Sequence, residues 1–96
     1  MIRLHKSQFS KMTFERLLPH LAESIKNRRT RLSLSHAELA DLTGLSAEYL
    51  DFIESGGTNF SMKTLSTIAE ALNTVPSELI EEAEHLADAQ ARDGLR

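Results

Sequence analysis

The stretch SHAELADLTGLSAEYLDFIES, residues 35–55, decides the fold. Ser35 is followed three residues later by Glu38, the spacing of a capping box, in which a hydroxyl and a carboxylate each satisfy a free backbone N–H at a helix start. Gly44 predicts the end of that helix, because glycine adopts a left-handed conformation at little cost. Ser46 predicts the N-cap of a second helix. The stretch therefore predicts two short helices joined by a tight turn.

Apolar residues at helical spacing predict one helix before this stretch and two after it. The first begins at Phe14 or Pro19 and ends at Leu32, and Pro19 favours the later start because proline suits a first helical turn. Ser61 predicts the cap of the fourth helix, and Pro76 predicts the start of the fifth. The apolar residues of these three helices are Leu18, Leu21, Ile25 and Leu32, then Leu65, Ile68, Ala69 and Leu72, then Leu79, Ile80, Ala83, Leu86 and Ala87.

The length and the helix pattern together predict one all-α domain of five helices. A chain of 96 residues corresponds to a single domain, and Pro and Gly are too few for a many-turned β fold. We expect a basic N-terminal arm over residues 1–13, the helical domain over residues 14–88 and a frayed C-terminal tail over residues 89–96.

The composition excludes several classes of protein and site. The chain has no Cys, which excludes disulfides and thiolate zinc sites, and its four His are too dispersed for metal-ligand spacing. It contains neither a Gly-rich phosphate loop nor a nucleophile elbow. No apolar run approaches the ~20 residues of a membrane span, and residues 1–11 lack the apolar core of a signal peptide. The sequence predicts a cytoplasmic protein that is not an enzyme and uses no cofactor or metal.

Charge is distributed unevenly along the chain. Residues 1–31 hold eight Lys or Arg against two Asp or Glu, a net charge of +6. Residues 32–96 hold three Lys or Arg against twelve Asp or Glu, a net charge of −9. Such asymmetry suggests that the basic part faces a polyanion, although solvated surface charge gives the same pattern.

Residues 21–79 resemble the lambda-repressor-like (XRE-type) helix-turn-helix family. The matching pieces are LAESIKNRR (21–29), LSHAELADLTGLS (34–46), YLDFIESG (49–56), GTNFSMKTLSTIAEALN (57–73) and VPSEL (75–79). The resemblance implies a five-helix lambda-repressor-like bundle and a sequence-specific transcription regulator that binds double-stranded DNA, as a dimeric repressor. It implies that the helix after Ser46 is the recognition helix, which enters the major groove.

The resemblance also implies which residues contact DNA. Ser35 and His36 meet a phosphate at a helix N-terminus, Ala47, Glu48 and Asp51 face base edges, and the segment from Thr58 follows the sugar-phosphate backbone. The complete implied set is Ser35, His36, Ser46, Ala47, Glu48, Asp51, Phe52, Thr58, Asn59, Phe60 and Lys63. Arg29 and Glu54 match family positions that pair between the first and third helices, so a structural ion pair is expected.

The recognition helix departs from the family pattern in its charge. No Lys or Arg lies between Leu32 and Met62. Carboxylates accept hydrogen bonds from the N4 amino group of cytosine. However, their negative charge opposes the attraction to phosphates that supplies much of the affinity for DNA. We therefore expect backbone contacts from the basic part of the chain, at Arg3, Lys6, Lys11, Lys26, Arg28 and Arg31.

A protein-binding version of the fold is the alternative. In that case, the acidic helix contacts a basic partner, a toxin or a regulator through Glu48, Tyr49, Asp51 and Phe52, since an exposed aromatic among charges suits an interface anchor. The apolar stripe of the last helix continues to Leu86 and Ala87, which makes it a candidate dimer surface, although packing against the first helix explains it equally well.

Overall fold

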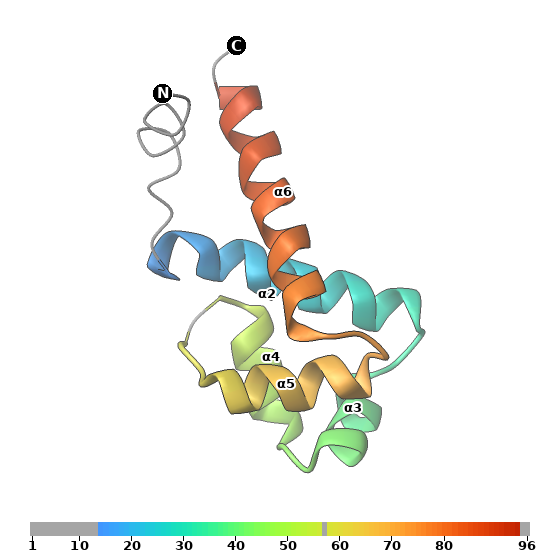
Figure 1. The fold of residues 1–96 in the computed structure, drawn as a ribbon. Coiled ribbons are helices and arrows are strands. Elements are labelled where there is room, and N and C mark those ends of the chain that lie inside the picture. The colour runs from blue at the N-terminus through green and yellow to red at the C-terminus, as the bar shows by residue number, and fades with distance from the viewer. Residues whose placement is uncertain (1–13, 57, 95–96) are drawn as a thin grey trace.

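Five α-helices and no strand make up the part of the chain that the computed structural model describes, residues 14–56 and 58–94. Figure 1 shows α3, α4 and α5 grouped on one side of α2, while α6 crosses α2 and extends beyond it. The predicted all-α bundle of five helices is confirmed. The helices are α2 (Phe14–Arg31), α3 (His36–Thr43), α4 (Ala47–Glu54), α5 (Met62–Ala71) and α6 (Pro76–Gly94).

One apolar core joins all five helices. Each fully buried Leu or Ile side chain stabilises the fold by about 1.5–3 kcal/mol. The predicted apolar faces form this core, with two exceptions. Leu32 follows the last residue of α2 and is exposed, and Leu86 of α6 is half-buried outside the core. The large buried residues are Leu21 and Ile25 of α2, Leu39 of α3, Leu50 and Ile53 of α4, Ile68 of α5, Leu72 at its end and Leu79 of α6.

The helix ends follow the local signals in the sequence. The Ser35 hydroxyl accepts from the Glu38 N–H at 3.0 Å and the Glu38 carboxylate accepts from the Ser35 N–H at 2.8 Å, so the predicted capping box is present. Gly44 ends α3 with φ +78°, and Ser46 and Ser61 cap α4 and α5. Each cap contributes about 1 kcal/mol. The turn between α3 and α4 is thus specified by residues within or beside it.

Of the two predicted starts of the first helix, the structure has the earlier one, and one other boundary is wrong. Helix α2 starts at Phe14 and contains Pro19 in its interior, where proline removes the hydrogen bond to the Glu15 carbonyl. Helix α6 continues through Gly94, beyond the predicted end at Asp88. The predicted arm over residues 1–13 lies outside the described residues.

A polar network attaches α6 to α2 beside the core. The fully buried Ser24 hydroxyl donates to the Glu82 carboxylate at 2.9 Å, and its oxygen lies 3.2 Å from the Leu79 carbonyl. Arg28 Nη2 lies 2.7 Å from the same carboxylate and 3.5 Å from that of Glu78. Desolvation raises the pKa of Glu82, but the hydrogen bonds from Arg28 and Ser24 and the nearby positive charge outweigh it, so the pKa is lowered.

Replacement of Glu82 by Gln is expected to lower stability at pH 7. Because the folded-state pKa of Glu82 is lowered, its stabilisation is present above the unfolded value of about 4.3 and is lost as pH falls through the folded value. We expect a loss of about 1 kcal/mol at pH 7, limited by screening because a third of the side chain is exposed. Urea denaturation at pH 7 and pH 3 measures this, with the exposed neighbour Glu81→Gln as control. A loss that is the same at both pH values would contradict the assignment.

Candidate nucleic-acid interface

Helix α4 presents one polar face outward and one apolar face to the core. Leu50 and Ile53 are fully buried, and Tyr49 packs against the core as a partly buried residue. Glu48 and Asp51 are exposed on the other side, and Phe52 is also exposed, with 52% of its surface accessible. An exposed Phe among carboxylates has no packing role within the described chain, so this face is available to a partner.

The residues predicted to contact the sugar-phosphate backbone come from the helix starts and the segment before α5. Ser35 and Ser46 are exposed N-caps of α3 and α4, and Lys63 is exposed in the first turn of α5. Asn59 is exposed and Thr58 is half-buried, with its hydroxyl donating to the Asn59 carbonyl at 3.1 Å. Phe60, by contrast, packs its side chain against the core. Its ring therefore has a structural role, which composition alone did not reveal.

The helix-turn-helix surface is acidic. Glu38 and Asp41 of α3 are exposed, as are Glu48 and Asp51 of α4, and no Lys or Arg lies between Leu32 and Met62 to balance them. A phosphate-lined groove would therefore receive little favourable charge from α3 and α4 themselves.

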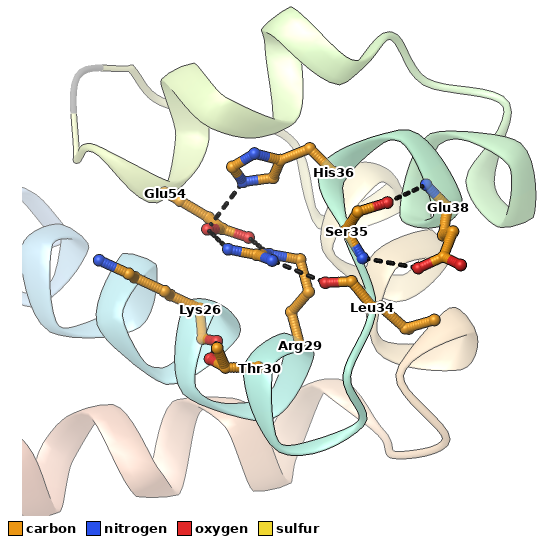
Figure 2. Close-up of polar contacts among 8 residues, drawn as sticks. All are labelled: Lys26, Arg29, Thr30, Leu34, Ser35, His36, Glu38 and Glu54. Carbon is orange, nitrogen blue, oxygen red and sulfur yellow. Dashed lines mark hydrogen bonds and ion pairs between the residues drawn. The ribbon is translucent and has the colours of Figure 1, made fainter.

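A buried carboxylate joins α2, α3 and α4 beside this surface. The Glu54 carboxylate accepts hydrogen bonds from Arg29 Nε at 2.7 Å and from Arg29 Nη2 at 3.0 Å. Arg29 Nη1 donates to the Leu34 carbonyl at 2.7 Å. Only 12% of the Arg29 side chain and 4% of the Glu54 side chain are exposed. Figure 2 shows Glu54 between the Arg29 guanidinium and the His36 imidazole. The structure thus contains the expected ion pair, with a third member.

The electrostatics of this cluster keep Arg29 charged. The hydrogen bonds with Glu54 raise the pKa of Arg29 above its ordinary value, against the effect of burial, and the charges of Glu54 and Asp51 raise it further. A bidentate pair of this kind fixes both distance and orientation. Glu54 ends α4 and Arg29 lies in the last turns of α2, so the pair sets how α4 is held against α2.

His36 has an intramolecular partner that the resemblance did not imply. Its Nε2 lies 2.9 Å from Glu54 Oε1, and 28% of its side chain is exposed. The ring is therefore directed at the ion pair, and a phosphate contact is open only to its outer edge. No local pattern in the sequence indicated this arrangement, since His36 and Glu54 are 18 residues apart.

The basic residues of α2 are divided between two roles. Arg28, which was predicted to contact a phosphate, forms ion pairs with Glu82 and Glu78 of α6. Its guanidinium therefore links α2 to α6. Lys26 is exposed, and Figure 2 shows it on the same side of α2 as Arg29. The other predicted backbone contact of α2 is Arg31, which is 66% exposed and lies 3.9 Å from Glu82. The predicted contacts at Arg3, Lys6 and Lys11 lie outside the described residues.

Metal coordination and membrane insertion can be assessed for residues 14–56 and 58–94. No group of three or more His, Cys, Asp or Glu is placed to hold a metal ion there. Among the same residues, no helix is long and apolar enough to cross a membrane. The predicted cytoplasmic location stays a prediction.

Comparisons with known proteins agree with this geometry. A family model described as Helix-turn-helix matches residues 25–80, more than half of the chain. The control protein C.SmaI of Serratia marcescens is 35% identical over 60 residues, which cover 62% of this chain and 71% of that protein.

Solved structures give the same result. The restriction-modification controller protein C.AhdI of Aeromonas hydrophila is 34% identical, with a TM-score of 0.63 over 65% of this chain and 94% of its own. The clp gene regulator ClgR of Corynebacterium glutamicum has a TM-score of 0.78 over 81% of this chain and 83% of its own. At 24% identity, this second likeness shows the fold alone.

Breaking the buried ion pair from one side is expected to be strongly destabilising. Arg29→Met leaves the Glu54 carboxylate buried without its bidentate partner, and we expect a loss of about 3–5 kcal/mol in the free energy of unfolding. The double variant Arg29→Met with Glu54→Leu removes both charges and is expected to recover much of this loss. Urea denaturation measures all variants, with the exposed Lys26→Met as control. A loss for Arg29→Met no larger than that of the control would contradict a structural role.

Proposed function

Because the chain belongs to the helix-turn-helix family whose model matches residues 25–80, we propose that it is a sequence-specific DNA-binding transcription regulator, acting as a dimeric repressor. The observation that carries the proposal is this match, which includes the helix-turn-helix formed by α3 and α4. The outer face of α4 is exposed, and its inner face is packed in the core. The control and controller proteins to which the chain is similar support a regulatory role. Such a role involves no catalysis by this chain.

In the proposed complex, the N-terminus of α4 enters the major groove. Glu48 and Asp51 accept hydrogen bonds from cytosine N4, while Ala47 and Phe52 contact thymine methyl groups. Ser35 brings the free N–H groups of the α3 N-terminus to a phosphate, where the positive end of the helix dipole favours an anion. The other proposed backbone contacts are Ser46, Thr58, Asn59 and Lys63.

Phosphate affinity comes mainly from outside α3 and α4 in this proposal. Arg28 and Arg29 are engaged with carboxylates, which leaves Lys26 and Arg31 as the exposed basic residues of the last turns of α2. Residues 1–13 add Arg3, Lys6 and Lys11 without any Asp or Glu. An N-terminal arm of this composition is suited to a minor groove.

A homodimer matches a palindromic site, with half-sites one helical turn, roughly 34 Å, apart. Ala87 is buried within the chain, so the predicted apolar stripe of α6 leaves Leu86 as its half-buried outer member. We place the contact between copies along the outer face of α6 that contains Leu86.

Binding to a protein through α4 is the second candidate function. Its support is the exposure of Phe52 beside Glu48 and Asp51, on a surface without Lys or Arg. A basic partner complements this charge, and an exposed aromatic is a common anchor at interfaces. An antitoxin-like or regulator-binding module would use the fold in this way.

Selection from a random duplex pool distinguishes the two functions. We expect the purified chain to enrich a palindrome and to bind it about 10³-fold more tightly than scrambled DNA at physiological salt. Fluorescence anisotropy measures both affinities. If no sequence is enriched and binding stays weak at low salt, the result rejects the DNA-binding proposal and favours the protein-binding alternative.

Neutralising the arm is expected to weaken DNA binding in a salt-dependent way. The triple variant Arg3→Gln, Lys6→Gln and Lys11→Gln removes three positive charges, and the slope of log affinity against log salt falls by about 0.9 for each phosphate that is no longer neutralised. Titration of the selected duplex at several salt concentrations measures the slope. Neutralising the exposed Arg92 of α6 is the control. An unchanged slope in the triple variant would exclude the arm from the interface.

A further inference from the structure

The hydrogen bond between His36 and Glu54 fixes which ring nitrogen carries a proton. Glu54 is bound by Arg29 through two hydrogen bonds, so its carboxylate is ionised and acts only as an acceptor. The imidazole Nε2 at 2.9 Å must therefore donate. In the neutral ring, the other nitrogen, Nδ1, then has a lone pair and no hydrogen.

The free nitrogen of His36 is not fully buried, and 28% of the side chain is exposed. Among the described residues, Nδ1 forms no hydrogen bond, and Figure 2 shows it on the side of the ring away from the carboxylate. His36 is the first residue of α3, next to the N-cap Ser35 that the proposed function places at a phosphate. A lone pair at this position repels a phosphate oxygen, whereas an N–H there donates to it.

We propose that DNA binding by this chain takes up one proton at His36. The imidazolium donates Nε2–H to Glu54 and Nδ1–H to a phosphate oxygen, and solvent supplies the proton. Glu54 holds the ring through Nε2, so that the second N–H, on Nδ1, is free for another acceptor while the first hydrogen bond is kept. The inference rests on the proposed function and makes His36 a phosphate contact whose strength depends on pH.

Charged groups of α2, α3 and α4 surround His36. Glu54 of α4 faces the ring directly, and Asp51 of the same helix adds negative charge close enough to act on Arg29. Arg29 and the exposed Lys26 of α2 oppose these charges. The remaining charged groups of α3 and α4 are Glu38, Asp41 and Glu48, all exposed and none in an ion pair within the described chain. In the last turns of α2, Arg28 and Arg31 lie near Glu82 of α6.

The balance of charge changes with the proton. Arg29 and Glu54 cancel, so the cluster is neutral with a neutral ring and carries one positive charge with an imidazolium. A nearby phosphate favours the charged form, and by linkage the proton favours bound DNA to the same extent.

The test is the affinity for the selected palindromic duplex between pH 5.5 and pH 8.5 at constant ionic strength. We expect the affinity to fall with rising pH, by up to about tenfold per pH unit where one full proton is taken up. His36→Gln keeps a side-chain donor for Glu54 but cannot be protonated, so its affinity is expected to vary little with pH. His85→Gln, on the exposed part of α6, is the matched control and keeps the dependence of the natural chain.

A second measurement needs no variant. Calorimetry of the natural chain with the duplex, in two buffers of different ionisation enthalpy, counts the protons taken up on binding. Net proton uptake on binding at any pH between 5.5 and 8.5 supports the proposal, and no uptake throughout this range overturns it. Equal pH slopes for the natural chain and for a His36→Gln variant shown by thermal denaturation to be folded also overturn it. Tight, specific binding that does not depend on pH rejects only this inference, whereas absence of binding at every pH rejects the proposed function with it.

Discussion

The buried carboxylate of Glu54 is the interaction on which the arrangement of α4 depends. Removing a carboxylate from water carries a penalty of several kcal/mol, and only donors fixed in the right places offset it. Arg29 supplies two of these donors and His36 a third. All three side chains reach one point only when α2, the start of α3 and the end of α4 take a single relative position. The apolar core supplies most of the stability, and this cluster selects the packing of α4 that keeps the charge satisfied.

Helix α2 holds a second carboxylate, Glu82 of α6, by the same means. Arg28 and Arg29 are neighbours in sequence, yet each is engaged with a different element of the fold. The net charge of +6 over residues 1–31 therefore overstates the charge that this region offers to a polyanion. In the proposed complex, that difference leaves phosphate binding mainly to Lys26, Arg31 and the arm.

The sequence predicted the features that local chemistry specifies and missed those that depend on distant partners. Ser35, Gly44 and Ser46 act within a few residues of themselves, so the caps and the turn were predictable. The interior position of Pro19 was not, because packing of α2 against α6 outweighs its local preference. Arg28 was expected to contact DNA because of its charge. Its actual partner, Glu82, is 54 residues away, so no local pattern indicated the ion pair. The Arg29–Glu54 pair was expected only through the family resemblance, since no local pattern links the two.

In the proposed complex, the acidic face of α4 contributes to specificity even though it weakens DNA affinity in general. The proposal pairs the Glu48 and Asp51 carboxylates with cytosine amino groups at a cognate site, whereas at other sites they meet acceptor edges and phosphates without compensation. Non-specific binding draws almost entirely on phosphate contacts, so negative charge on the recognition helix penalises it most. Discrimination then comes from repulsion at wrong sites as well as attraction at the right one. Because α4 is held by Glu54 and the core, it cannot turn its carboxylates away to escape that penalty.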